Sequence, residues 1–143
     1  MKRKASAVWQ GDLKTGKGSI STESGTLKQT QYSFSTRFEN GVGTNPEELI
    51  AAAHASCFSM MLSKLLGDAK KTASDIRTKA TLTLSNASGG WKISKIHLET
   101  EVSGEGLDAE TLNRTAAQAK EQCPISVLLK PVLESLTLDV KLK

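Results

Sequence analysis

The chain has two cysteines, and both stand where a thiol could do chemistry. Cys57 lies inside an uncharged run, residues 51–61, whereas Cys123 is followed directly by Pro124, where a helix is expected to stop. Two thiols on separate helical segments could share one redox site, with one attacking as a thiolate and the other resolving the oxidised form. The alternative is that both are small buried hydrophobes, because free cysteine is among the most buried residue types.

A reactive cysteine has to be a thiolate, and burial in an apolar helix opposes that charge. Cys57 lies about three turns beyond the predicted helix start at Pro46, too far for the helix dipole to help. The candidates for a nearby cation are His54, one turn earlier, and Arg37, at the end of a predicted strand. Arg37 could stabilise a thiolate and donate hydrogen bonds to a peroxide oxygen, or it could be an ordinary surface charge.

Glu47 is the candidate partner of that arginine. Its carboxylate could hold the Arg37 guanidinium in a paired contact, or it could simply favour the helix start, as the adjacent Glu48 does. On one unbroken helix Glu47 and Cys57 would be about 15 Å apart along the axis, too far to share a site within one chain. We therefore hypothesise that Glu47, and Arg37 with it, comes from a partner subunit.

The first half of the chain predicts short strands followed by one long helix. Antiparallel strands are expected at 5–9, 18–22 and 32–35, with a turn at 23–25. The helix should run from Pro46 to about Leu66 and end at Gly67. Because it carries no charge between residues 49 and 63 and is a poor membrane span, it is expected to be a core helix covered by other helices or by a second copy in a homodimer.

The second half predicts two strands, a helical region and a closing strand. The expected elements are a half-buried strand at 75–85, a turn at 86–90, a strand at 91–102 with a bulge at Ser94–Lys95, a helix capped by Asp108, a short helix before Pro131, and a strand at 136–142. This order indicates one α+β domain, 1–143, with antiparallel sheets packed around two core helices.

Composition narrows the classes of function. The 19 Lys and Arg are scattered among 15 acids, and only 4% of residues are aromatic, so neither the basic face nor the stacking groups of a nucleic-acid-binding protein are visible. No apolar segment of signal-peptide length follows Met1, so we expect a cytoplasmic protein without a membrane partner. In that compartment a lone cysteine pair is more often catalytic than structural.

Several motifs together resemble the osmotically inducible protein C (OsmC) family, whose relatives are the organic hydroperoxide resistance proteins. The resemblance covers essentially the whole chain and rests on the segments 9–14, 21–25, 36–39, 44–49, 54–60 and 123–126. It implies an OsmC-like fold in an intertwined homodimer, and a thiol peroxidase that acts on organic hydroperoxides and, less efficiently, on hydrogen peroxide in oxidative and osmotic stress.

The resemblance also implies a role for each candidate residue. The family cysteine matching Cys57 attacks the peroxide and becomes a sulfenic acid, and the one matching Cys123 condenses with it to a disulfide. Arg37 and Glu47 match the family's arginine and glutamate. The reductant in relatives is a dithiol, with lipoyl groups implied for part of the family. Neither a metal ion nor a bound cofactor is expected.

Three other functions compete with the peroxidase. His54 and Cys57 have the i, i+3 spacing of a cysteine hydrolase, although neither an oxyanion hole nor an orienting group for the histidine is visible. A zinc site would need Cys57, Cys123, His54 and His97, which lack paired local spacing. A non-enzymatic protein could instead bind an acyl ligand in an apolar pocket at the dimer interface.

Overall fold

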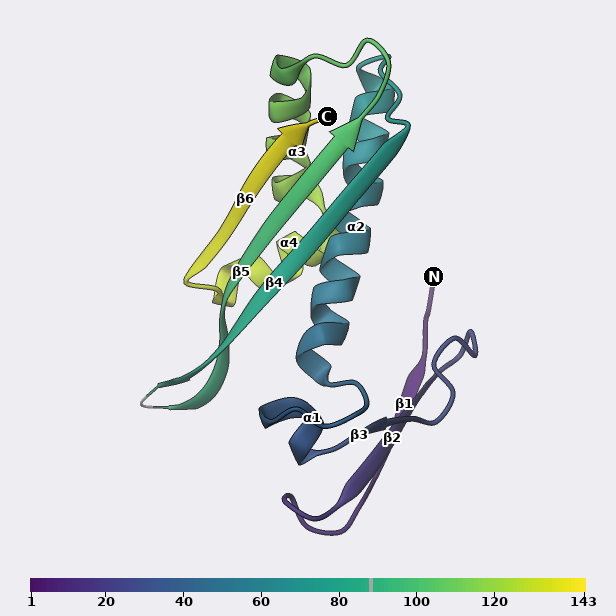
Figure 1. Ribbon diagram of the computed structural model, residues 1–143, viewed down its shortest axis with the longest axis vertical. Helices are drawn as coiled ribbons and strands as arrows, with labels where there is room; N and C mark the ends of the chain where they lie inside the picture. Colours follow the sequence, from purple (N-terminus) through teal and green to yellow (C-terminus); the bar gives the residue numbers. More distant parts are fainter. Residues whose placement is uncertain (88) are drawn as a thin grey trace. The chain divides into compact units, whose positions relative to one another are not determined.

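The computed structural model describes residues 1–87 and 89–143, which form two compact units, residues 1–49 and 50–143 (Figure 1). The boundary falls within the first turn of one continuous helix, α2 (Pro46–Asp68). The mixture of helices and strands confirms the predicted α+β class. Ser88, in the predicted turn at 86–90, lies outside the described residues.

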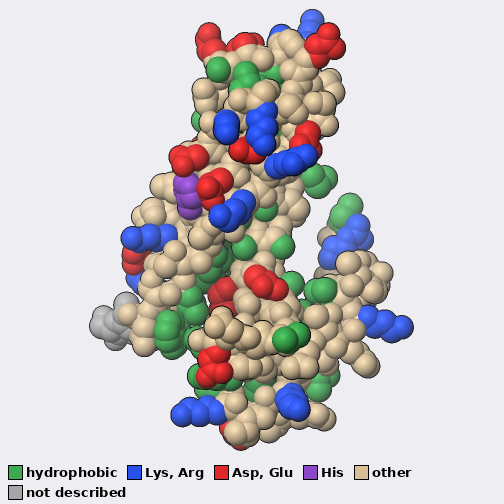
Figure 2. Space-filling view, viewed as in Figure 1, with side chains coloured by type: hydrophobic (Ala, Val, Ile, Leu, Met, Phe, Trp, Pro, Cys, Tyr) green, Lys and Arg blue, Asp and Glu red, His purple; other side chains and the backbone are tan. Residues whose placement is uncertain are grey.

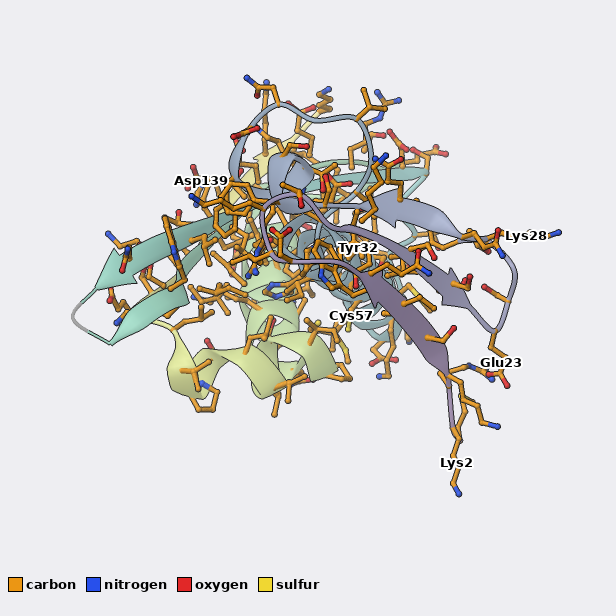
Figure 3. All side chains as sticks on the ribbon, turned by 90° about the horizontal axis from the view of Figure 1, so that it is seen from below. Lys2, Glu23, Lys28, Tyr32, Cys57 and Asp139 are labelled. Carbon is orange, nitrogen blue, oxygen red and sulfur yellow. The ribbon has the colours of Figure 1, made fainter. Side chains whose placement is uncertain are left out.

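The first unit contains a small antiparallel sheet in the order β1-β2-β3. Its strands are β1 (Ala5–Gln10), β2 (Lys17–Thr22) and β3 (Thr30–Tyr32). The predicted turn after β2 is present, and Gly25 there has a positive φ of 75°, a conformation that glycine adopts without strain. The side chains of Lys2, Glu23 and Lys28 point outward from this unit (Figure 3).

The predicted strand at 32–35 is wrong beyond Tyr32, because a short helix, α1 (Phe34–Phe38), begins there. Ser33 forms a capping box with Thr36: the Ser33 hydroxyl accepts from the Thr36 amide, and the Thr36 hydroxyl accepts from the Ser33 amide. These two hydrogen bonds satisfy amides at the helix start. Arg37 consequently lies in a helix rather than at the end of a strand.

The long helix α2 begins where the sequence predicts, with the Asn45 side chain accepting from the Glu48 amide at 2.8 Å. Its predicted end is wrong, because the helix continues through Gly67 to Asp68. The left-handed residue that closes it is Lys70, with φ of 57°. The amides of Lys70 and Lys71 donate to the carbonyls of Gly67 and Leu66, which is the pattern of a Schellman motif.

The second unit contains the larger sheet, in the order β4-β5-β6. Strands β4 (Asp75–Ala87) and β5 (Gly90–Ser103) are antiparallel, and the predicted bulge is confirmed because Ser94 falls between the pairs Thr83 with Lys95 and Leu84 with Ile93. The expectation of purely antiparallel sheets is wrong, because β6 (Ser135–Leu142) runs parallel to β5.

That parallel pairing follows from the helical connection between β5 and β6. The connection consists of α3 (Ala109–Gln122), α4 (Pro124–Leu129) and a 3₁₀ turn (Lys130–Val132). Parallel neighbours need such a crossover, whereas antiparallel ones can be joined by a tight turn. Asp108 caps α3 as predicted, since its carboxylate accepts from the Thr111 amide at 2.7 Å.

Helices α2, α3 and α4 lie on one face of this sheet (Figure 1), and the core of the unit fills the space between them. Its fully buried apolar residues come from α2, β5 and α3 and include Phe58, Leu62, Leu66, Ile96, Leu98, Val102, Leu112, Ala116 and Ala119. Lysine, arginine and acidic side chains are interspersed on the molecular face drawn in Figure 2. No single-sign patch dominates that view.

By length and composition alone, α2 could cross a membrane. The core helix of a soluble protein meets the same criteria, and α2 contributes Phe58, Leu62 and Leu66 to the core of the second unit. The opposite side of the helix leaves Met60 75% exposed in the single chain. The composition of α2 is therefore weak evidence for a membrane span.

Candidate active site

The two cysteines meet in the second unit although they are 66 positions apart in the sequence. Cys57 lies in the middle of α2 (Figure 3), and Cys123 lies at the junction where α3 ends and α4 begins. Their Sγ atoms are 2.7 Å apart, and both are free thiols. Cys57 is partly exposed, whereas Cys123 is fully buried. The tertiary structure thus brings together the pair that the sequence singled out.

Pro124 is the local reason that Cys123 lies at a helix junction. A residue before proline is disfavoured in the helical conformation, and Cys123 has φ of −57° and ψ of 124°, outside the helical range. Proline is well suited to the first turn of the next helix, where its missing amide hydrogen is not needed. The Cys-Pro sequence therefore ends α3, starts α4 and leaves the Cys123 thiol at the turn.

The surroundings of Cys57 disfavour its thiolate. Burial raises the pKa of the Cys57 thiol above that of an exposed cysteine, the hydrogen bond with Cys123 raises it further, and a backbone hydrogen bond from Ile125 opposes this by lowering it. Hydrogen bonding from an amide favours the charged sulfur, but burial dominates the balance. Within the second unit alone, Cys57 is therefore a weakly acidic thiol that would need a cation for activation.

His54 does not supply that cation. It is fully buried, and its Nε2 atom is hydrogen-bonded to the Ser126 hydroxyl at 2.8 Å. Burial lowers the pKa of the imidazole, which favours the neutral ring at physiological pH. Its Nδ1 atom has no hydrogen-bond partner among the described residues, so neither ring nitrogen is bonded to Cys57. The His54–Cys57 pairing required by a cysteine hydrolase is absent from this arrangement.

Arg37 and Glu47 form an ion pair in the first unit. The Arg37 Nη2 atom donates to Glu47 Oε1 at 2.6 Å, and Nε donates to the same oxygen at 3.0 Å. The Arg37 guanidinium also lies over the Phe38 ring, 5.1 Å from its centroid. Glu48, by contrast, accepts a hydrogen bond from Thr44 at 2.7 Å. The two adjacent glutamates therefore have different partners, and Glu47 is the one that orients the arginine.

An apolar pocket of about 310 Å³ lies beside Arg37 in the same unit. It is lined by Trp9, Leu13, Tyr32, Ser33, Phe34, Arg37, Phe38 and Pro46. The sequence interpretation missed this pocket because its aromatic residues come from β1, β3 and α1, which only the fold brings together. The one local signal was the i, i+4 spacing of Phe34 and Phe38, whose rings are 4.9 Å apart.

The structure does not support the zinc alternative. In residues 1–87 and 89–143, no group of three or more histidine, cysteine or acidic side chains could hold a metal ion. Cys57 and Cys123 contact each other, whereas the imidazole of His97 is hydrogen-bonded to Thr137 at 2.8 Å. The donors that a zinc site would need are thus divided between different contacts.

An α+β fold in which two helices bring free thiols together defines a protein suited to thiol–disulfide chemistry. Comparison with known sequences identifies the family: residues 38–135 match the model of the OsmC-like protein family. The chain is 50% identical over 141 residues to peroxiredoxin OsmC of Escherichia coli (strain K12), and the aligned residues cover 99% of this chain and 96% of the relative. It therefore belongs to the OsmC-like family, as the sequence motifs indicated.

More distant similarities agree with this assignment. The organic hydroperoxide resistance protein OhrB of Bacillus subtilis (strain 168) is 30% identical over 110 residues, covering 76% of this chain and 79% of that protein. The crystal structure of OhrB from Bacillus subtilis superposes with a TM-score of 0.68 at 24% identity, covering 98% of each chain. An organic hydroperoxide resistance protein from Elizabethkingia anophelis gives a TM-score of 0.79 at 20% identity, covering 100% of this chain and 99% of that chain. The two structural similarities establish the fold.

The burial of His54 predicts a specific pH dependence of stability. Its folded-state pKa is lowered, whereas in the unfolded chain it should titrate near its ordinary value of about 6.5. As the pH falls below that value the unfolded chain binds a proton that the folded chain does not, so the free energy of unfolding decreases. The His54→Gln variant should lose this component, which amounts to at most about 1.4 kcal/mol per pH unit.

Urea unfolding of both proteins between about pH 7 and 5 measures the difference, in a range above the ordinary pKa values of the carboxyl groups. Equal slopes for the wild type and His54→Gln would contradict neutral burial of this histidine.

Proposed function

We propose that this OsmC-family thiol peroxidase reduces organic hydroperoxides through Cys57 as the attacking thiol and Cys123 as the resolving thiol. The observation that carries the proposal is the 2.7 Å separation of the two free sulfurs in a chain 50% identical to a peroxiredoxin. Cys57 is the attacking residue because it is partly exposed, whereas Cys123 is fully buried. A peroxide can therefore approach Cys57 more readily.

The chemistry balances with these two residues and one external reductant. The Cys57 thiolate attacks one peroxide oxygen, the O–O bond breaks, and the leaving alkoxide takes a proton, which gives an alcohol and a Cys57 sulfenic acid. The Cys123 sulfur then attacks the Cys57 sulfur, which forms a disulfide and releases water. A dithiol, which we propose to be of the lipoyl type, supplies two electrons and two protons to restore both thiols. Hydrogen peroxide should react by the same steps, but more slowly because it lacks a hydrocarbon group.

Substituting each cysteine separately tests these roles. With one equivalent of cumene hydroperoxide, the wild type should lose both thiols and form an internal disulfide. Cys57→Ser should consume no peroxide, whereas Cys123→Ser should consume one equivalent and stop at the sulfenic acid, because no second thiol can resolve it. Thiol titration and intact-mass spectrometry measure the products. Peroxide consumption by Cys57→Ser would overturn the assignment, and no consumption by the wild type would favour a non-enzymatic acyl-binding protein.

We further propose that Arg37 supplies the positive charge that Cys57 lacks, with Glu47 holding the guanidinium. An opposite charge near a buried thiol favours the thiolate, and an arginine can also donate hydrogen bonds to a peroxide oxygen. Glu47 and Cys57 are ten residues apart on α2, which corresponds to about 15 Å along the helix axis. This spacing supports the proposal that the Arg37–Glu47 pair of one chain serves Cys57 of its partner.

A homodimer would also cover apolar surface that the single chain leaves exposed. None of the apolar side chains in residues 1–49 is fully buried. In the second unit, Met60 on α2 and Leu128 on α4 are 75% and 69% exposed. An apolar surface of this kind is typical of subunit interfaces. We propose that a second copy covers it and completes two active sites.

Mixed dimers test whether the sites are shared. Glu47→Ala and Cys57→Ser homodimers should each have low activity, but random reassortment should restore up to about a quarter of wild-type activity, because one site in each heterodimer is intact. Mixing Glu47→Ala with Arg37→Ala is the matched control, since both sites then stay defective. Peroxidase rates before and after subunit exchange provide the measurement, and the absence of recovery in the first mixture would count against sharing.

The pocket beside Arg37 supports a preference for hydroperoxides with an apolar group. Its aromatic lining can accommodate hydrocarbon, and the arginine at its edge can donate to oxygen. The same combination would suit the acyl ligand of the non-enzymatic alternative, so the pocket indicates the chemical class of the ligand rather than the reaction. We propose that it holds the organic part of the substrate.

Removing one aromatic ring should therefore affect large and small peroxides differently. Phe34→Ala should raise KM for cumene hydroperoxide by about 10-fold, which corresponds to losing about 1.4 kcal/mol of apolar contact. The kcat/KM for hydrogen peroxide should stay unchanged, because this substrate has no apolar group. Val42→Ala, an exposed apolar residue that does not line the pocket, is the control. Equal losses for both peroxides in Phe34→Ala would contradict the proposed specificity.

The remaining expectations concern organisation and location. A soluble protein fits the relatives, and we propose that this one acts in the cytoplasm, where dithiol reductants are available. The single OsmC-like domain over 1–143 stays a prediction.

A further inference from the structure

A buried hydrogen bond joins the two helical segments that carry the cysteines. His54 on α2 and Ser126 on α4 are 72 positions apart, yet His54 Nε2 and Ser126 Oγ are 2.8 Å from each other. Both residues have no exposed surface. A side-chain hydrogen bond excluded from water has a defined geometry and no competing solvent partner. It can therefore fix how α4 lies against α2.

Each end of this bond lies three residues from one of the two cysteines. His54 precedes Cys57 by three residues on α2, and Ser126 follows Cys123 by three residues. Ser126 also directly follows Ile125, whose backbone amide is hydrogen-bonded to the Cys57 thiol. A shift of α4 along α2 would therefore move the Cys123 sulfur and the Ile125 amide away from Cys57 together.

Burying this pair carries a cost that an apolar pair would avoid. The Nδ1 atom of His54 is buried with no hydrogen-bond partner among the described residues. An unsatisfied buried polar atom costs about 1–3 kcal/mol, and replacing both partners of a buried hydrogen bond by apolar groups is often neutral or stabilising. Net stability is thus a poor reason for a histidine here, and a role in fixing geometry explains the pair better.

We propose that the His54–Ser126 hydrogen bond is a positioning device that holds Cys123 against Cys57, so that the sulfenic acid is resolved before a second peroxide reaches it. The inference rests on the proposed roles of the two cysteines. The sulfenic acid has two fates. Attack by the Cys123 sulfur gives the disulfide and water, whereas attack of the sulfenate on another hydroperoxide gives a sulfinic acid and a second alcohol. Faster resolution protects the enzyme from irreversible oxidation.

Three variants separate this role from a general contribution to folding. Ser126→Ala removes the hydroxyl partner, and His54→Phe replaces the imidazole by an apolar ring. His54→Gln retains a polar group that can reach the position of Nε2 and should restore the bond. Thr115→Val is the matched control, since Thr115 is also buried but its hydroxyl donates within α3, to Thr111 and Leu112.

Each protein is treated with excess cumene hydroperoxide, alkylated with N-ethylmaleimide and examined by intact-mass spectrometry, which separates disulfide from sulfinic acid. Ser126→Ala and His54→Phe should raise the ratio of sulfinic acid to disulfide by about 2- to 10-fold, the range expected from losing one hydrogen bond. His54→Gln should return the ratio toward that of the wild type, and Thr115→Val should leave it unchanged. Near-ultraviolet circular dichroism checks that each variant is folded.

An unchanged ratio in folded Ser126→Ala overturns the proposal, and so does an equal rise in Thr115→Val. If His54→Phe fails to fold, Ser126→Ala carries the test, because it removes a single oxygen atom. A wild type that forms no disulfide would refute the proposed roles of the cysteines, whereas a normal wild type with indistinguishable variants would refute only the positioning role.

Discussion

Helix α2 carries no charge between residues 49 and 63, and the packing of this segment against the sheet and α3 is the constraint on which the rest of the second unit depends. Phe58 and Leu62 have no exposed surface, and burial of such side chains is the main favourable contribution to folding. Cys57 precedes Phe58 directly, so its depth and direction are set by this packing. The same burial that forms the core raises the pKa of the thiol. Stability and reactivity thus oppose each other at one position of the helix.

The crossover between β5 and β6 determines where the second thiol lies. A parallel pairing of these strands requires a long connection, and the chain provides it as α3 and α4 on the same face of the sheet as α2. Pro124 divides that connection into two helices, and Cys123 lies at the division. The helix would set the direction of a thiol in the middle of α3 or α4. At the junction, Cys123 instead has a non-helical backbone conformation, with ψ of 124°.

The buried polar groups around the cysteines have different consequences for the sulfur. The Ile125 amide donates to Cys57 and favours its charged form, whereas the contact with Cys123 favours the neutral form. The His54–Ser126 bond joins the helices without supplying a charge. In the first unit, Glu47 orients Arg37 beside an apolar pocket. The second unit thus holds a buried thiol against Cys57, and the first unit holds a guanidinium whose position is fixed by a carboxylate.

The sequence by itself determined the family and singled out the two cysteines and the Arg37–Glu47 pair as candidates. It also predicted most of the helices and strands, because helix caps, hydrophobic alternation and proline act over a few residues. The left-handed cap of α2 at Lys70 and the short helix after Ser33 were not predicted, since both depend on which local hydrogen bonds form in the folded chain. Only the tertiary structure decided the parallel pairing of β6, the aromatic pocket and the contact between the sulfurs. Each joins segments distant in sequence, and packing rather than local preference selects such contacts.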